Sequence, residues 1–125
     1  MEQLIEVIQH NNIAEVAFNR PKSFNAFDLD TISEMANVLT RLAKDDSVKG
    51  IVVTGRGKAF CAGGDLKWAV NFSEKPGTSF HKLASQLNVV VLAIREMSKP
   101  VVAAINGAAA GAGFAIALAC DFRVM

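Results

Sequence analysis

Two glycine-rich stretches hold the residues of this sequence that are best suited to chemistry. The first, CAGGD, spans residues 61–65, and the second, NGAAAGAGFAIALACD, spans residues 106–121. Each follows an apolar run that predicts a buried strand, and each precedes a predicted helix. Backbone N–H groups at the start of a helix have no partner within that helix. Two such loops side by side would direct one N–H each at a single oxygen, which predicts an oxyanion hole.

Three other interpretations of the second stretch are open from the residues alone. Residues 101–120 carry no charge, but their large apolar side chains supply only roughly −3 kcal/mol for insertion, which disfavours a membrane span. A phosphate-binding loop needs Lys and Ser or Thr after its last glycine, where Phe114 and Ala115 stand, and a dinucleotide fingerprint needs glycine at Ile116. A helix of closely packed small residues explains the alanines, but not why a similar loop follows another strand.

The rest of the sequence predicts one α/β domain, residues 1–125, whose elements position these loops. Alternating polarity predicts a hairpin from residues 4–9 and 13–19, and short apolar runs at 50–55 and 101–105 predict buried strands. Helical periodicity predicts a helix from an N-cap at Asp28 to about Ala43, and another from Phe80 to Met97. The sequence also predicts a short helix over residues 113–120 and a final strand that begins within residues 121–125. Residues 66–77 have no clear pattern, and Pro76-Gly77 predicts a turn there.

Composition excludes several functional classes. Thirteen basic and twelve acidic residues give a net charge of +1, and without a basic cluster we expect no nucleic-acid partner. Cys61 and Cys120 match no metal-binding spacing, so we expect two reduced thiols and no metal. The N-terminus lacks the basic and apolar regions of a signal peptide, which predicts a cytoplasmic protein.

Four stretches in order make the sequence resemble the crotonase superfamily, the enoyl-CoA hydratase/isomerase family. They are NRPKSFNAFD (19–28), GIVVTG (50–55), GKAFCAGGDLK (57–67) and KPVVAAINGAAAGAGFAIALACD (99–121). The resemblance implies a crotonase-like spiral of ββα units, here its N-terminal portion, truncated after the second loop and its helix. It also implies an acyl-CoA substrate with no cofactor besides that coenzyme A thioester, and assembly into homotrimers or hexamers.

The resemblance assigns roles to particular residues. It places the two oxyanion donors on the backbone N–H groups of Gly64 and Ala112. The remaining residues would bind substrate: the loops through Ala62, Asp65, Leu66, Lys67 and Gly111, and the coenzyme A through Lys22, Asn25 and Ala26. Other interpretations of these and nearby side chains are simpler. Asp65 suits a helix N-cap, the lysines suit a solvated surface, Trp68 and Phe72 suit packing, His81 suits a polar helix face, and Cys61 has no histidine to activate it.

One departure from the family pattern bears on the reaction. Family hydratases carry a glutamate two residues after the last glycine of the second loop, where this sequence has Ala115. Alanine transfers no proton, so the resemblance favours isomerase-type proton transfer over hydration, with the acid or base located beyond Met125. The alternative is a non-catalytic acyl-CoA-binding or interaction module on a crotonase-like scaffold.

Overall fold

A five-stranded sheet, in the order β1-β2-β3-β5-β7, forms the centre of the fold. The structure is a computed structural model that describes residues 3–72 and 75–125. The predicted hairpin is confirmed: β1 (Ile5–His10) and β2 (Ile13–Phe18) pair antiparallel. The predicted strands β3 (Gly50–Gly55), β5 (Val101–Ala104) and β7 (Phe122–Val124) follow in parallel. Parallel strands end at the same edge of the sheet, so the segments that follow β3 and β5 start close together.

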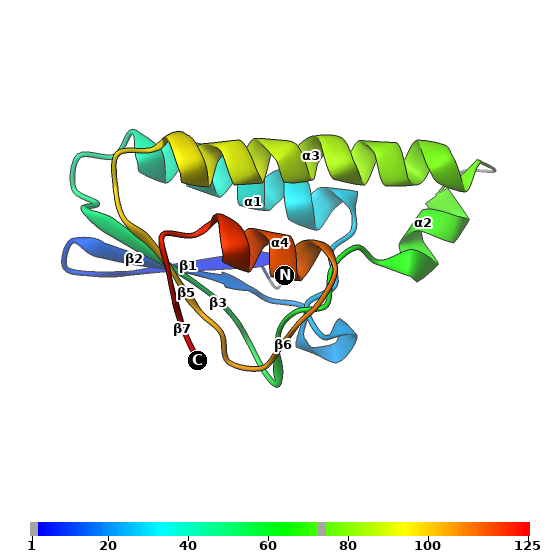
Figure 1. Ribbon diagram of the computed structural model, residues 1–125, viewed down its shortest axis with the longest axis horizontal. Coiled ribbons are helices and arrows are strands. Elements are labelled where there is room, and N and C mark those ends of the chain that lie inside the picture. Colours follow the sequence, from blue (N-terminus) through cyan, green and yellow to red (C-terminus); the bar gives the residue numbers. More distant parts are fainter. Residues whose placement is uncertain (1–2, 73–74) are drawn as a thin grey trace.

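Two long helices, α1 (Leu29–Ala43) and α3 (Pro76–Glu96), pack against each other above the sheet (Figure 1). The predicted cap of α1 is confirmed, because the Asp28 carboxylate accepts a hydrogen bond from the Thr31 N–H at 2.9 Å. The apolar stripe of α1 is fully buried, because its side chains Ile32, Met35 and Leu39 are 0% exposed. These side chains meet the buried strand residues in one core, which fixes the helical layer on the sheet.

A second, two-stranded sheet was not predicted from the sequence. Its strands β4 (Ala59–Cys61) and β6 (Ala108–Ala109) pair in parallel, and β4 leads to α2 (Leu66–Phe72) while β6 leads to α4 (Ala112–Ala119). Strands of two or three residues are too short to show alternation, so the sequence pattern cannot reveal them. A short 3-10 turn, η1 (Pro21–Ser23), follows β2.

The predicted turn at Pro76-Gly77 is wrong, because α3 begins at Pro76. Proline suits the first position of a helix, where its missing N–H would have no partner in any case. Part of the unassigned segment 66–77 forms α2, and its residues 73 and 74 lie outside the described residues.

Candidate active site

The β4–β6 pair brings the two glycine-rich loops to one place. The first loop (residues 62–65) connects β4 to α2, and the second loop (residues 110–112) leaves β6 and ends in the first residue of α4. The Ala110 N–H donates to the Cys61 carbonyl oxygen at 3.1 Å, which continues the strand pairing into the loops. Because the two strands run parallel, both helix starts lie at the same end of this small sheet.

Two glycines make the close approach of the loops possible. Gly63 has φ +99°, and a β-carbon on it would lie 3.2 Å from the Ala112 nitrogen. A β-carbon on Gly113 would lie 2.1 Å from the Cys61 carbonyl oxygen, a distance that no side chain tolerates. The sequence therefore places glycine where one backbone must touch the other.

Both loops hold backbone N–H groups without an acceptor among the described residues: that of Gly64 in the first loop, and those of Gly111 and Ala112 in the second. In the first loop the Phe27 N–H donates to the Gly63 oxygen at 2.8 Å, and the Asp65 N–H donates to the Phe27 oxygen at 2.9 Å. The N–H of Gly64, which lies between Gly63 and Asp65, takes no part in either bond. In the second loop the Gly113 N–H donates to the Ala110 oxygen at 2.9 Å, and Ala112 is the first residue of α4. Across residues 3–72 and 75–125, the Gly64 and Ala112 N–H groups donate to no protein acceptor.

Gly64 and Ala112 line the same cavity, which has a volume of about 450 Å³. The loops also contribute Ala62 and Gly111. The remaining walls are hydrocarbon side chains from the segment before α1 and from α2 and α3, namely Phe27, Leu66, Phe80, Leu83, Ala84 and Leu87. The polar groups that a ligand would meet on these described walls are therefore backbone groups.

The side chain of Asp65 stabilises the first loop rather than facing the cavity. Its carboxylate accepts from the Trp68 N–H at 3.1 Å, which confirms the predicted N-cap of α2. The same carboxylate pairs with the Arg20 guanidinium at 3.2 Å, and both side chains are mostly buried. The Arg20 guanidinium also donates to the Ala26 carbonyl oxygen, which ties the first loop to the segment after β2.

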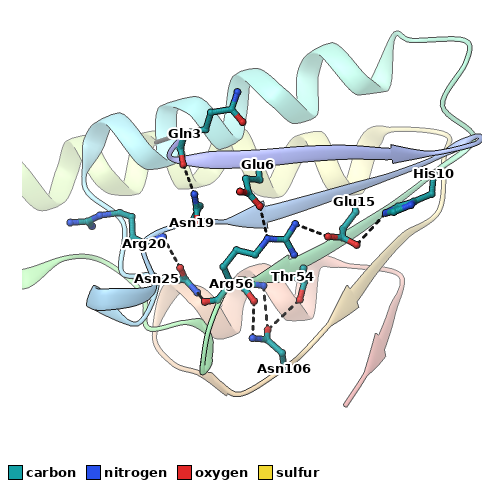
Figure 2. A network of polar contacts seen from close by, with 11 residues as sticks. Gln3, Glu6, His10, Glu15, Asn19, Arg20, Asn25, Thr54, Arg56 and Asn106 are labelled. Atoms are coloured by element: carbon teal, nitrogen blue, oxygen red, sulfur yellow. Dashed lines mark hydrogen bonds and ion pairs between the residues drawn. The ribbon is translucent and has the colours of Figure 1, made fainter. Parts of the chain in front are cut away.

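Asn25, which the resemblance placed at the coenzyme A, has a fully buried side chain. Its amide nitrogen donates to the Arg56 carbonyl oxygen at 2.9 Å (Figure 2). It also donates to the Ala59 carbonyl oxygen at 2.8 Å. The Asn25 and Ala26 N–H groups donate within the same turn, so a ligand here would meet carbonyl oxygens. Lys22 and Lys67 are exposed and lie outside the residues that line the cavity.

Asn106 has a matching structural role that sequence reasoning missed. Its amide nitrogen donates to the Gly55 oxygen at 2.8 Å, and its amide oxygen accepts from the Gly55 N–H at 3.2 Å (Figure 2). Asn106 also donates to the Gly57 and Ala59 oxygens, so Asn25 and Asn106 both bind the turn that joins β3 to β4. Arg56 in this turn also pairs with Glu6 and Glu15, at 2.6 and 2.7 Å. Asparagines that border tight turns were the signal available in the sequence.

Other candidate side chains take structural positions. Burial raises the pKa of the Cys61 thiol to about 11, so it is protonated at neutral pH and is a poor nucleophile. His81 is exposed, as the polar-face interpretation predicted. Trp68 and Phe72 stack on each other with ring centroids 4.5 Å apart and lie outside the cavity lining.

Fold and site together define an α/β protein in which backbone N–H groups of two loops, without acceptors among the described residues, lie at one apolar cavity. The enoyl-CoA hydratase/isomerase sequence profile matches residues 8–125, and the chain belongs to this family. It is 39% identical over 116 residues to a probable enoyl-CoA hydratase of Mycobacterium leprae, which covers 90% of this chain and 40% of that relative. A crotonyl-CoA hydratase of Syntrophomonas wolfei is 37% identical over 117 residues, covering 93% of this chain and 44% of that relative.

Solved structures give the same result for the fold. A crystal structure of an enoyl-CoA hydratase from Bacillus anthracis matches with a TM-score of 0.89 and 33% identity, over 97% of this chain and 46% of that chain. A monofunctional enoyl-CoA isomerase from M. smegmatis matches with a TM-score of 0.79 and 31% identity, over 98% of this chain and 49% of that chain. The predicted crotonase-like fold is confirmed, and the chain spans about half or less of the length of these relatives. Within the described ranges, no helix combines the length and the apolar character that a bilayer crossing requires.

Proposed function

We propose that the protein binds an acyl-CoA with the thioester oxygen between the N–H groups of Gly64 and Ala112. Negative charge would collect on that oxygen as an enolate forms. The observation that supports this most strongly is that the Gly64 and Ala112 N–H groups, which have no acceptor among the described residues, line one apolar cavity. Fixed donors in an apolar site stabilise developing charge more strongly than water does, because they need no reorganisation.

The other residues that the resemblance assigned would surround this oxygen or hold the coenzyme A. Ala62, Leu66 and Gly111 line the cavity and would contact the acyl group close to the thioester. Asp65 would act through the loop that it caps. The exposed lysines, Lys22 and Lys67, and the carbonyl oxygens of Asn25 and Ala26 would face the coenzyme A.

We favour isomerase-type proton transfer over hydration. Hydration uses a second carboxylate to activate water, and Ala115 stands at that position, one turn after Ala112 on α4. Among the described residues that line the cavity, none has a side chain that is an acid or a base. A base from elsewhere in the full protein would remove a proton from one carbon and return it to another. Several relatives are named hydratases, so this preference depends on Ala115.

The substitution Ala112→Pro tests the oxyanion site directly. Ala112 is the first residue of α4, a position that suits proline, whose ring carbon replaces the hydrogen of the N–H. In the intact natural protein we expect kcat/KM for an enoyl-CoA to fall by about 10²–10³. The control, Ala112→Ser, keeps the N–H and should stay within about tenfold of the native protein. Equal activity of the proline variant and the native protein would refute the site.

Isotope exchange separates isomerisation from hydration and from binding alone. With 3-enoyl-CoA in D₂O, an isomerase forms the conjugated 2-enoyl thioester and gains deuterium on carbon, whereas a hydratase adds ¹⁸O from labelled water to 2-enoyl-CoA. Rapid ¹⁸O addition to 2-enoyl-CoA would contradict our preference. Acyl-CoA binding without either exchange would instead support the alternative, a non-catalytic acyl-CoA-binding module. The described cavity walls favour that alternative in one respect, because they carry no acid or base.

We also propose that the full protein assembles as a homotrimer or hexamer, as the family resemblance implies. Analytical ultracentrifugation of the intact protein tests this. A mass of three or six chains is expected, and a monomer at micromolar concentration would contradict it.

A further inference from the structure

The cavity beside the two loops has a wall with a regular pattern. Phe80, Leu83, Ala84 and Leu87 of α3 line it, and their spacing of three, one and three residues places them on one face of the helix. This stripe spans two turns, or about 10 Å along the helix axis. Ala84 is its one small residue, flanked by Phe80 one turn before and Leu87 one turn after.

The hydrocarbon character of this wall extends to its exposed side chains. Leu66 at the start of α2 is 66% exposed, and Phe80 of α3 is 41% exposed, although both line the cavity. Apolar side chains exposed together in a concave surface indicate a site for an apolar ligand. Leu83 is buried, with 4% of its surface exposed, and it lies close to the first loop. A β-carbon on Gly64 would lie 3.4 Å from the Leu83 Cδ1 atom. At Leu83 the stripe on α3 therefore lies beside the first loop.

We infer that this cavity selects acyl groups that are uncharged hydrocarbon chains, and that Ala84 determines how large an acyl group enters. The inference rests on the proposed function, because a thioester oxygen held at Gly64 and Ala112 directs the acyl chain along the α3 stripe. A chain lying there would contact Leu83, Ala84 and Leu87 and would cover Phe80 and Leu66.

Two physical arguments set the selectivity. Each methylene that enters an apolar cavity contributes hydrophobic free energy, which corresponds to about fourfold tighter binding. A carboxylate at the end of the acyl chain finds no partner, since the described wall residues offer no side-chain donor or cation. Burying it unpaired should weaken binding by at least about a hundredfold relative to a methyl-ended chain of equal length.

The role of Ala84 follows from its size. A leucine at this position adds a branched side chain to the middle of the stripe, where a long acyl chain would lie. Long chains should then be excluded, while an acetyl group at the loops remains unaffected. Ser85→Leu is the matched control, because Ser85 is the next residue on α3, is exposed and does not line the cavity.

The test measures dissociation constants of the intact natural protein for free coenzyme A and its saturated acetyl, butanoyl, hexanoyl, octanoyl and succinyl thioesters. These thioesters lack the double bond of an enoyl substrate, so calorimetry reports binding alone. We expect affinity to rise about fourfold per methylene up to a limiting length, and succinyl-CoA to bind at least about a hundredfold more weakly than its uncharged neighbour in the series. In Ala84→Leu the rise should stop at a shorter chain, whereas Ser85→Leu should follow the native series.

Failure of this inference differs from failure of the proposed function. Equal affinities for all acyl-CoAs, tight binding of succinyl-CoA, or an unchanged series in Ala84→Leu would each overturn the selectivity while leaving the oxyanion site intact. If no thioester binds more tightly than free coenzyme A, and Ala112→Pro changes nothing, the proposed function fails and this inference fails with it. Circular dichroism of each variant confirms that the helices are retained.

Discussion

The two glycine-rich loops present the same kind of group, an unpaired N–H, but the molecule holds them by different means. In the first loop, a side chain caps the following helix: Asp65 accepts from the Trp68 N–H and pairs with Arg20. In the second loop, the N-cap of α4 is Gly111 and no side-chain cap is formed. The position of the Gly64 N–H thus depends on side-chain hydrogen bonds, whereas the position of the Ala112 N–H depends on backbone packing.

The helices that follow the two loops, α2 and α4, also differ in how much of them is buried. In α4, Gly113, Ile116, Ala117 and Ala119 are buried, whereas in α2 only Ala69 is buried among the described residues. The second loop is further fixed by Gly107, where a β-carbon would lie 1.8 Å from the Lys58 carbonyl oxygen. Its position is therefore determined by excluded volume, which salt affects little. The first loop is determined by directional bonds, which substitutions can remove one at a time.

The largest effect on folding is expected for Gly113→Ala. The new β-carbon would lie 2.1 Å from the Cys61 oxygen and 2.9 Å from its Cβ atom, so α4 must move away from β4. Overpacking commonly costs about 1–3 kcal/mol, and a clash with backbone belongs at or above that upper limit. Urea unfolding of the intact protein measures the change.

Gly77→Ala is the matched control for that substitution. Gly77 lies in the first turn of α3, and its β-carbon would meet nothing within 4 Å. Alanine there should leave stability unchanged or raise it by up to about 1 kcal/mol, because alanine favours helix. If Gly113→Ala were as stable as Gly77→Ala, packing would not be what holds the second loop.

Sequence patterns predicted the elements that have a period and missed those that do not. The stripe of α1 and the cap at Asp28 are read directly from residue spacing, as is the hairpin. The β4–β6 sheet was missed because its strands have three and two residues, too few for alternation. The meeting of Gly63 with Ala112 is a contact distant in sequence, and glycine indicates only that some close approach occurs. The site residues came from the family resemblance, and the cavity that Gly64 and Ala112 share could be found only from the fold.

A smaller effect on folding is expected at the first loop, for Asp65→Ala. This substitution removes the cap of α2 and leaves Arg20, which is mostly buried, without its carboxylate. Loss of an N-cap typically costs about 1 kcal/mol, and the lost ion pair adds a few tenths or more. Asp65→Asn keeps an oxygen for the Trp68 N–H and should lose less. A stability change for Asp65→Ala no larger than that for Asp65→Asn would show that the cap contributes nothing.

Alkaline pH tests the packing of β4 against the second loop. Burial raises the pKa of Cys61 to about 11, whereas an unfolded cysteine titrates near 8.5. Below pH 8.5 the thiol is neutral in both states, and stability does not depend on it. As the pH rises from about 8.5 to 11, the unfolded state loses the proton first, so the free energy of unfolding falls.

The matched variant for this test is Cys61→Ala, which removes the titrating group. Its free energy of unfolding should fall less between pH 7.5 and pH 10 than that of the native protein. Cys120, whose pKa is also raised to about 11 by burial, is present in both proteins and cancels in the comparison. An identical decline in both would contradict the protected state of Cys61.

The smallest effect on folding is expected for Gly64→Ala, although it should impair ligand binding. A β-carbon on Gly64 meets only the Leu83 Cδ1 atom, at an ordinary 3.4 Å, and the N–H is retained. The free energy of unfolding should therefore change by no more than about 0.5 kcal/mol. The added methyl group would project toward Leu83, which lines the same cavity, and would occupy the space beside the proposed thioester oxygen. Butanoyl-CoA should bind about 5- to 150-fold more weakly, as expected for overpacking that costs about 1–3 kcal/mol, while free coenzyme A binds as before. We therefore expect Gly113 to be required for folding and Gly64 to be required for ligand binding. If Gly64→Ala lowered the free energy of unfolding as much as Gly113→Ala does, the two loops would not differ in this way.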